Sequence, residues 1–140
     1  MVFFDTSVLI AALLPEHPFH PQSRQRLLSC GEREGAIGAR SLAELYTVLT
    51  GLPRRPKISP RVALQLIQPL LNRFEVVDLD QQDYVHVIQR AAASGCAGGR
   101  LYDALLVECA RKVDASQIFT LNMKDYSAVA PDLAGRILAP

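Results

Sequence analysis

Short apolar runs alternate with longer segments of helical periodicity along this chain. We expect strands over residues 2–5, 35–39, 74–79 and 117–121, with residues 136–139 as a short fifth strand. We expect helices over residues 6–14, 22–33, 41–50, 59–73, 81–94 and 102–113. Strands separated by helices predict an α/β fold in which helices cover both faces of a mainly parallel sheet.

Polar residues follow several of these strands directly. Asp5 ends the first strand, Ser41 and Glu44 follow the second, and Asn122 and Asp125 follow the fourth. Ligands of open parallel sheets bind beyond the carboxyl ends of the strands. The pattern therefore predicts a functional site at that edge of the sheet.

Composition narrows the class of protein. A length of 140 residues suits one domain, spanning 1–140, and 49% hydrophobic with 21% charged residues is ordinary for a globular chain. No apolar run is long enough to span a membrane, and Asp5 interrupts the apolar opening segment, which also lacks the basic start of a signal peptide. Three cysteines without CxxC spacing favour reduced thiols, and we expect a cytoplasmic protein. A net charge of +1 does not by itself indicate a nucleic-acid partner.

Each candidate acid has a structural alternative at a helix start. Asp5 or Thr6 would cap the first helix, Ser41 and Glu44 match the capping-box pattern S-x-x-E, and Asp103 would interact with a helix dipole. Asn122 would cap a short helix with Asp125 at its third position. The apolar sequence around Asp5 favours a metal ligand at that position, because a buried carboxylate needs a partner.

Taken together, the acids point to a cation. Two carboxylates 4 Å apart repel by about 4 kcal/mol at an effective dielectric near 20, so a cluster protonates or binds an ion. With no histidine or thiol close in sequence, the oxygen ligands suit Mg²⁺ or Mn²⁺. Such ions polarise phosphoryl oxygens and lower the pKa of bound water.

Four segments in order, FFDTSVLIAAL, SLAELYTVLTGLP, GGRLYDALLVECA and FTLNMKDY, resemble the PIN-domain family, in particular its VapC-type toxins. The resemblance covers essentially the whole chain. It implies a three-layer α/β/α fold with about five mostly parallel strands. It also implies a metal-dependent endoribonuclease that acts as the toxin of a type II toxin–antitoxin pair.

The resemblance carries over to matching positions. Asp5 and Asp103 would bind the metal directly, and Glu44 directly or through water. The fourth position falls on Asn122, where many members have Asp, which leaves one metal or two open; Asp125 is a candidate for the missing charge. Thr6 and Thr120 would place hydroxyls beside the site.

Substrate and partner surfaces are less specific. Arg54 and Arg55 lie in the basic stretch PRRPKISPR, which is either an RNA phosphate contact or a solvated linker, while Arg100 and Lys124 flank two of the ligand motifs. The resemblance implies a cognate antitoxin on the apolar first helices and pairing of two chains as a homodimer.

Two rival interpretations remain. A phosphohydrolase would use Asp5 as nucleophile, but Ser7 stands where the haloacid-dehalogenase type needs a second acid. A PIN scaffold that binds RNA or a partner without cleavage is favoured by Asn122. Transfer, ribosomal and messenger RNA are all open as substrates.

Overall fold

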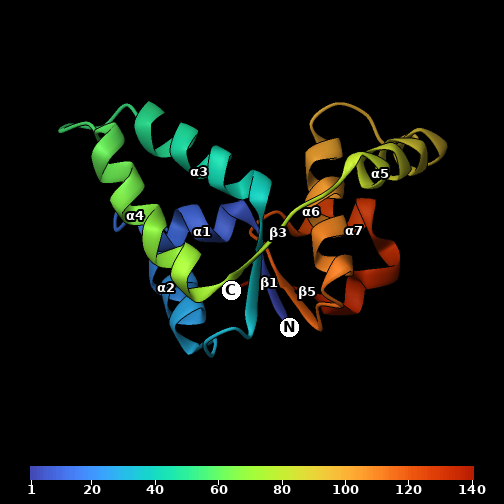
Figure 1. Ribbon diagram of the computed structural model, residues 1–140, viewed down its shortest axis with the longest axis horizontal. Coiled ribbons are helices and arrows are strands. Elements are labelled where there is room, and N and C mark those ends of the chain that lie inside the picture. Colours follow the sequence, from blue (N-terminus) through green and yellow to red (C-terminus); the bar gives the residue numbers. More distant parts are fainter.

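The structure, a computed structural model, describes residues 1–140. Its centre is a sheet of five parallel strands in the order β3-β2-β1-β4-β5 (Figure 1). The strands are β1 (Val2–Phe4), β2 (Gly35–Gly38), β3 (Glu75–Val77), β4 (Gln117–Phe119) and β5 (Ile137–Leu138). The expected α/β/α fold is confirmed, including the short fifth strand.

Helices form the two outer layers. On one side of the sheet lie α1 (Thr6–Leu13), α2 (His20–Ser29), α3 (Ala39–Gly51) and α4 (Pro60–Arg73), drawn on the left of Figure 1. On the other side lie α5 (Gln81–Ala93), α6 (Arg100–Lys112), α7 (Met123–Val129) and the 3₁₀ helix η1 (Pro131–Arg136). No helix combines the length and the apolar character that a membrane span requires.

Two apolar cores fix these layers to the sheet. Side chains of successive strand residues point to opposite faces, so Phe4 packs with α1–α4 while Phe3 packs with α6 and α7. The same alternation separates Phe119 from Ile118 on β4. Burial on both faces explains why these strands read as continuous apolar runs.

Several element boundaries differ from the expected ones. Helix α2 begins at His20 rather than 22, because Pro21 is tolerated in a first turn, and it ends at Ser29 rather than 33. Helix α3 begins at Ala39 instead of Ser41, and α6 at Arg100 instead of Tyr102. Strand β3 covers only Glu75–Val77 of the expected 74–79. Helix α7 corresponds to the short helix that the sequence offers as an alternative after Asn122. The 3₁₀ helix η1 was not expected.

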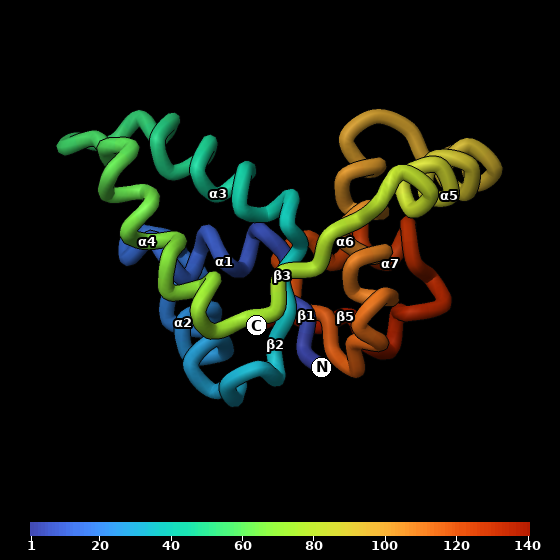
Figure 2. Tube along the Cα trace, viewed as in Figure 1, coloured from blue at the N-terminus to red at the C-terminus, as the bar shows by residue number.

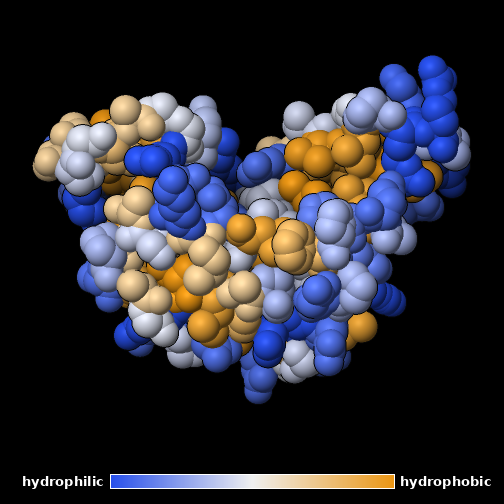
Figure 3. All heavy atoms as spheres, turned by 180° about the vertical axis from the view of Figure 1, so that it is seen from behind, coloured by the Kyte–Doolittle hydropathy of each residue, from blue (hydrophilic) through white to orange (hydrophobic).

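The two helical layers diverge beyond the carboxyl ends of the strands. The Cα trace shows α3 and α6 separating on either side of the point where β1 and β2 end (Figure 2). Viewed from behind, the molecular surface is hollowed between these two arms (Figure 3). This hollow lies at the edge of the sheet where the sequence places its acidic residues.

Candidate active site

The Asp5 carboxylate is buried, with only 4% of the residue exposed, at the carboxyl end of β1. Its Oδ2 accepts hydrogen bonds from Ser7 Oγ at 2.5 Å and from Thr120 Oγ1 at 2.8 Å. Its Oδ1 accepts one from the Tyr126 hydroxyl at 2.7 Å. Asp5 holds the N-cap position of α1, but its side chain makes no capping hydrogen bond, so the capping alternative is wrong. Three hydroxyl donors instead fix the orientation of the carboxylate.

Tyr126 is a site residue that the sequence did not reveal. It lies on α7, has no exposed surface, and places its hydroxyl on Asp5. Burial, followed by the charge of Asp5, raises the pKa of the phenol well above its usual range. The phenol therefore stays protonated and acts as a donor. In sequence, a tyrosine in a short amphipathic segment looks like an ordinary core residue.

Thr6 and Ser41 connect α1 with α3. Thr6 Oγ1 donates to Ser41 Oγ at 2.8 Å, and both residues are buried. Because α3 begins at Ala39 with Gly38 as its N-cap, Ser41 is not a cap and Glu44 does not reach back to one. The capping-box interpretation is therefore wrong. Glu44 lies one turn further along α3 with its side chain exposed.

Asp103 lies in the first turn of α6 and has a perturbed pKa. Its pKa is raised to about 6, first by burial and then by the charges of Asp5, Asp125 and Glu44, with Arg100 acting in the opposite direction. Three predicted acids that are far from Asp103 or from one another in sequence thus lie near enough to act on its carboxyl group. A nearby cation would relieve this repulsion.

Asn122 also turns toward Asp103. Its Nδ2 donates to Asp103 Oδ2 across 3.4 Å, and its side chain makes no capping bond to α7, which excludes the cap interpretation. Asp125, in the same helix, forms an ion pair with Arg100 at 3.2 Å. Its charge is therefore partly compensated within the chain.

The donor chemistry of this site fits a hard divalent ion. It consists of carboxylates, one amide and several hydroxyls, and Asp103 is destabilised in its charged form. No three acidic, imidazole or thiol side chains, however, stand close enough together to hold a metal as they lie. Binding of a shared ion by these acids would therefore require side-chain movement, and Glu44 is the one of the four acids that is exposed.

The basic residues proposed to contact the substrate differ in whether they form ion pairs with acids of the protein. Arg54 forms an ion pair with Glu16 at 3.3 Å, and Arg100 is paired with Asp125. Arg55 and Lys124 are exposed and take part in no ion pair. The hydroxyl of Thr120 contacts Asp5, whereas that of Thr6 contacts Ser41.

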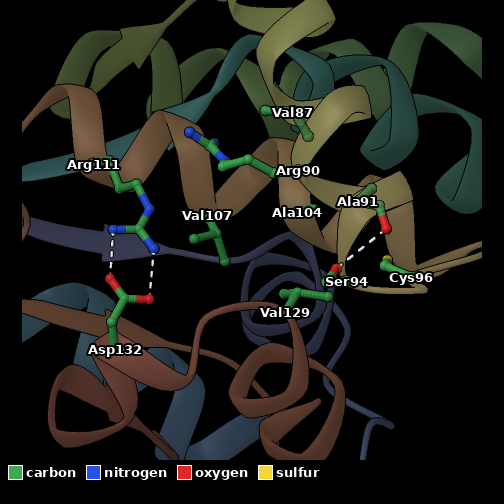
Figure 4. A pocket seen from close by; sticks show the side chains of 10 residues that line it. All are labelled: Val87, Arg90, Ala91, Ser94, Cys96, Ala104, Val107, Arg111, Val129 and Asp132. Atoms are coloured by element: carbon green, nitrogen blue, oxygen red, sulfur yellow. Dashed lines mark hydrogen bonds and ion pairs between the residues drawn. The ribbon is translucent and has the colours of Figure 1, made fainter.

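A separate pocket lies between α5, α6 and α7 (Figure 4). Arg90 and Arg111 line it, but Arg90 pairs with Glu108 and Arg111 makes two hydrogen bonds to Asp132. None of the predicted site residues borders this pocket. With both arginines neutralised, it offers no site for a phosphate.

All three cysteines are free thiols, as expected.

Comparisons with known proteins identify the family of this chain. The PIN-domain family model matches residues 2–130. Ribonuclease VapC27 of Mycobacterium tuberculosis is 35% identical over 103 residues, which cover 73% of this chain and 71% of that protein. The chain therefore belongs to the PIN-domain family, which confirms the resemblance read from its motifs. One member of the family to which it is similar in sequence is this ribonuclease.

Solved structures support the same fold. The crystal structure of VapC20 from Mycobacterium tuberculosis, a toxin that cleaves the sarcin–ricin loop, has a TM-score of 0.74 at 16% identity and covers 91% of this chain and 95% of that one. A toxin–antitoxin complex from Klebsiella pneumoniae has a TM-score of 0.70 at 16% identity and covers 100% and 98%. At these identities the likeness concerns the fold.

Proposed function

We propose that this PIN-domain chain is an endoribonuclease that depends on Mg²⁺ or Mn²⁺ and acts as the toxin of a type II toxin–antitoxin pair. The observation that carries the proposal is the buried Asp5 carboxylate, oriented by three hydroxyls at the carboxyl edge of the sheet. Asp103, Glu44 and Asp125 lie near this carboxylate, since the charges of Asp5, Asp125 and Glu44 all raise the pKa of Asp103. Sequence similarity to a VapC ribonuclease supports RNA as the substrate.

The chain supplies orientation and charge to the reaction. Asp5, Asp103 and Glu44 would hold the ion, with Asn122 as a neutral fourth ligand and Asp125 as a source of negative charge. A bound divalent ion supplies an activated water and neutralises charge on the phosphoryl oxygens. Tyr126, Thr120 and Ser7 keep Asp5 in one orientation. Neither Ser7 nor Ser41 has a histidine partner that would activate it as a nucleophile, so water is the attacking group in this proposal.

Partners follow from the same comparison. Structural relatives include a toxin–antitoxin complex, VapBC2 bound to a DNA fragment from its promoter, and FitAB bound to the IR36 DNA fragment. We infer a cognate antitoxin for this chain, a homodimeric toxin and action in the cytoplasm. These inferences rest on the relatives and on the three unpaired cysteines.

Cleavage of RNA by the purified chain tests the proposal. We expect cleavage with Mg²⁺ or Mn²⁺, none in EDTA, and a loss on the order of 100-fold in Asp5→Asn, Glu44→Gln and Asp103→Asn. Glu75→Gln, an exposed acid at the start of β3, is the matched control and should cleave as the wild type does. Undiminished cleavage in both Asp5→Asn and Asp103→Asn would overturn the assignment.

A scaffold that binds RNA without cleaving it is the second candidate, favoured by the amide at position 122 and by the lack of a ready-made ligand cluster. Metal titration separates the two functions. A nuclease should show stabilisation by Mn²⁺ in thermal unfolding and should lose it in Asp103→Asn. A scaffold should show neither that stabilisation nor any RNA cleavage.

A further inference from the structure

Arg40 and Tyr102 form a contact between α3 and α6 that none of the functions above uses. The Arg40 guanidinium carbon lies 3.8 Å from the centre of the Tyr102 ring, which is the geometry of a cation–π interaction. Arg40 occupies the first turn of α3, and Tyr102 the first turn of α6. The pair therefore joins the two arms at the base of the hollow between them.

The charge of Arg40 is not compensated by an acidic side chain of the protein. Arg40 takes part in no ion pair and no hydrogen bond, and its Nε is buried without a partner. The tyrosine face stabilises the charge but accepts none of the guanidinium N–H groups. The buried Nε is out of reach of an outside ligand, but both Nη groups are unpaired and reach solvent, so they are free to donate to a partner that binds from outside.

The position of the pair relative to the acids limits what that partner is. Arg40 precedes Glu44 by one helical turn, and Tyr102 immediately precedes Asp103. Arg40 also borders a small recess with Asp78 and Leu79, so the pair lies on the β3 side of the acidic group. An anionic ligand would suit both ends of that path, because Arg40 attracts it at one end and a divalent ion held by the acids would attract it at the other.

We propose that Arg40, held against the Tyr102 ring, binds a backbone phosphate of the RNA strand next to the phosphate that is cleaved. The proposal rests on the proposed function, which places an RNA strand at the acids. The planar guanidinium fork matches phosphate oxygens in two-point contact. Tyr102, 51% exposed, leaves ring surface for a base to stack upon. Arg40 is then a substrate-positioning residue on the β3 side of the site.

RNA binding without cleavage measures this contact directly. A fluorescein-labelled 12-nucleotide RNA of mixed sequence is titrated in EDTA at several NaCl concentrations, and the slope of log K against log salt is compared between variants. We expect Arg40→Gln to weaken binding several-fold and to reduce the slope by about 0.7, the value for one phosphate contact with a single strand. Arg40→Lys should keep the slope but bind more weakly, because it retains the charge and loses the fork.

A second variant at the pair and a distant arginine complete the set. Tyr102→Leu should lose part of the affinity, because the guanidinium loses the ring that it packs against. Arg24→Gln removes an exposed arginine on α2 and should leave both affinity and slope unchanged. In cleavage assays Arg40→Gln should raise KM more than it lowers kcat.

The outcomes separate the two proposals. Wild-type protein that binds RNA with Arg40-dependent slope but never cleaves it would contradict the nuclease and leave the phosphate contact standing. Equal affinity and slope in wild type, Arg40→Gln and Arg40→Lys would overturn the contact, whether or not RNA is cut. If Arg40→Gln instead weakens binding of the antitoxin alone, the arginine serves the protein partner and the RNA contact is refuted.

Discussion

The Tyr126 hydroxyl and the Asp5 carboxylate, separated by 121 residues in sequence, share a hydrogen bond of 2.7 Å in a fully buried environment. This bond attaches α7 to the end of β1. Asp5 also accepts hydrogen bonds from Thr120 and Ser7, and the three donors together leave its carboxylate little rotational freedom. A metal ligand that is oriented in advance binds its ion without first losing side-chain entropy.

Tyr126→Phe removes this one donor and leaves the ring in place. A hydrogen bond to a charged group contributes about 2 kcal/mol, so we expect the free energy of unfolding to fall by that order. Loss of such an orienting contact should also lower metal affinity and RNA cleavage about tenfold. Denaturant unfolding, Mn²⁺ titration and cleavage assays measure the three effects. Tyr84→Phe, with an exposed hydroxyl on α5, is the control; equal behaviour of the two variants would contradict the orienting role.

Asp103 makes the stability of the metal-free protein depend on pH. Its pKa is about 6 in the folded chain against 3.8 as the ordinary value. Because the folded state holds the proton more tightly, stability falls as the pH rises from about 4 to about 6. The loss at pH 7 is at most about 3 kcal/mol, and solvent screening of this partly buried group makes it smaller.

Asp103→Asn should therefore stabilise the protein in EDTA at pH 7, although it lowers cleavage in the presence of metal on the order of 100-fold. We expect a higher Tm by about 3 °C and a flatter dependence of Tm on pH between about 4 and 6. Mn²⁺ should raise the Tm of the wild type and leave that of the variant unchanged. A variant less stable than the wild type at pH 7 would show that Asp103 is a structural rather than a functional charge.

Part of this candidate site could be predicted from the sequence because Asp5 follows β1 directly and Glu44 follows β2, and parallel strands bring their carboxyl ends to one edge. Asp103 follows no strand, since α6 comes after α5, and its candidacy came from its place at a helix start and from the family motif around it. The partners of Asp5 were harder to predict. Tyr126 looks like a core residue in sequence, and its hydroxyl reaches Asp5 only in the folded chain. The capping alternatives failed for a local reason, because α3 begins two residues earlier than its S-x-x-E pattern indicates.

Asn122→Asp tests why this chain has an amide at the fourth position. Asn122 donates to Asp103 across 3.4 Å, so an aspartate there would replace attraction with repulsion. Without metal we expect a lower Tm and a further rise in the pKa of Asp103. With Mn²⁺ we expect tighter binding, by about tenfold, because a charged ligand replaces a neutral one. Unchanged Mn²⁺ affinity, measured by calorimetry, would show that position 122 lies outside the coordination sphere.

The basic stretch between α3 and α4 offers two arginines with different freedom. Arg55 is exposed and unpaired, whereas Arg54 lies 3.3 Å from a carboxylate oxygen of Glu16. If this stretch contacts RNA, Arg55→Gln should lower the salt slope of binding by about 0.7, and Arg54→Gln should lower it less. Glu16→Gln should strengthen binding, since it releases Arg54 for phosphate. A solvated linker would leave all three variants indistinguishable from wild type, because exposed ion pairs contribute little to the fold itself.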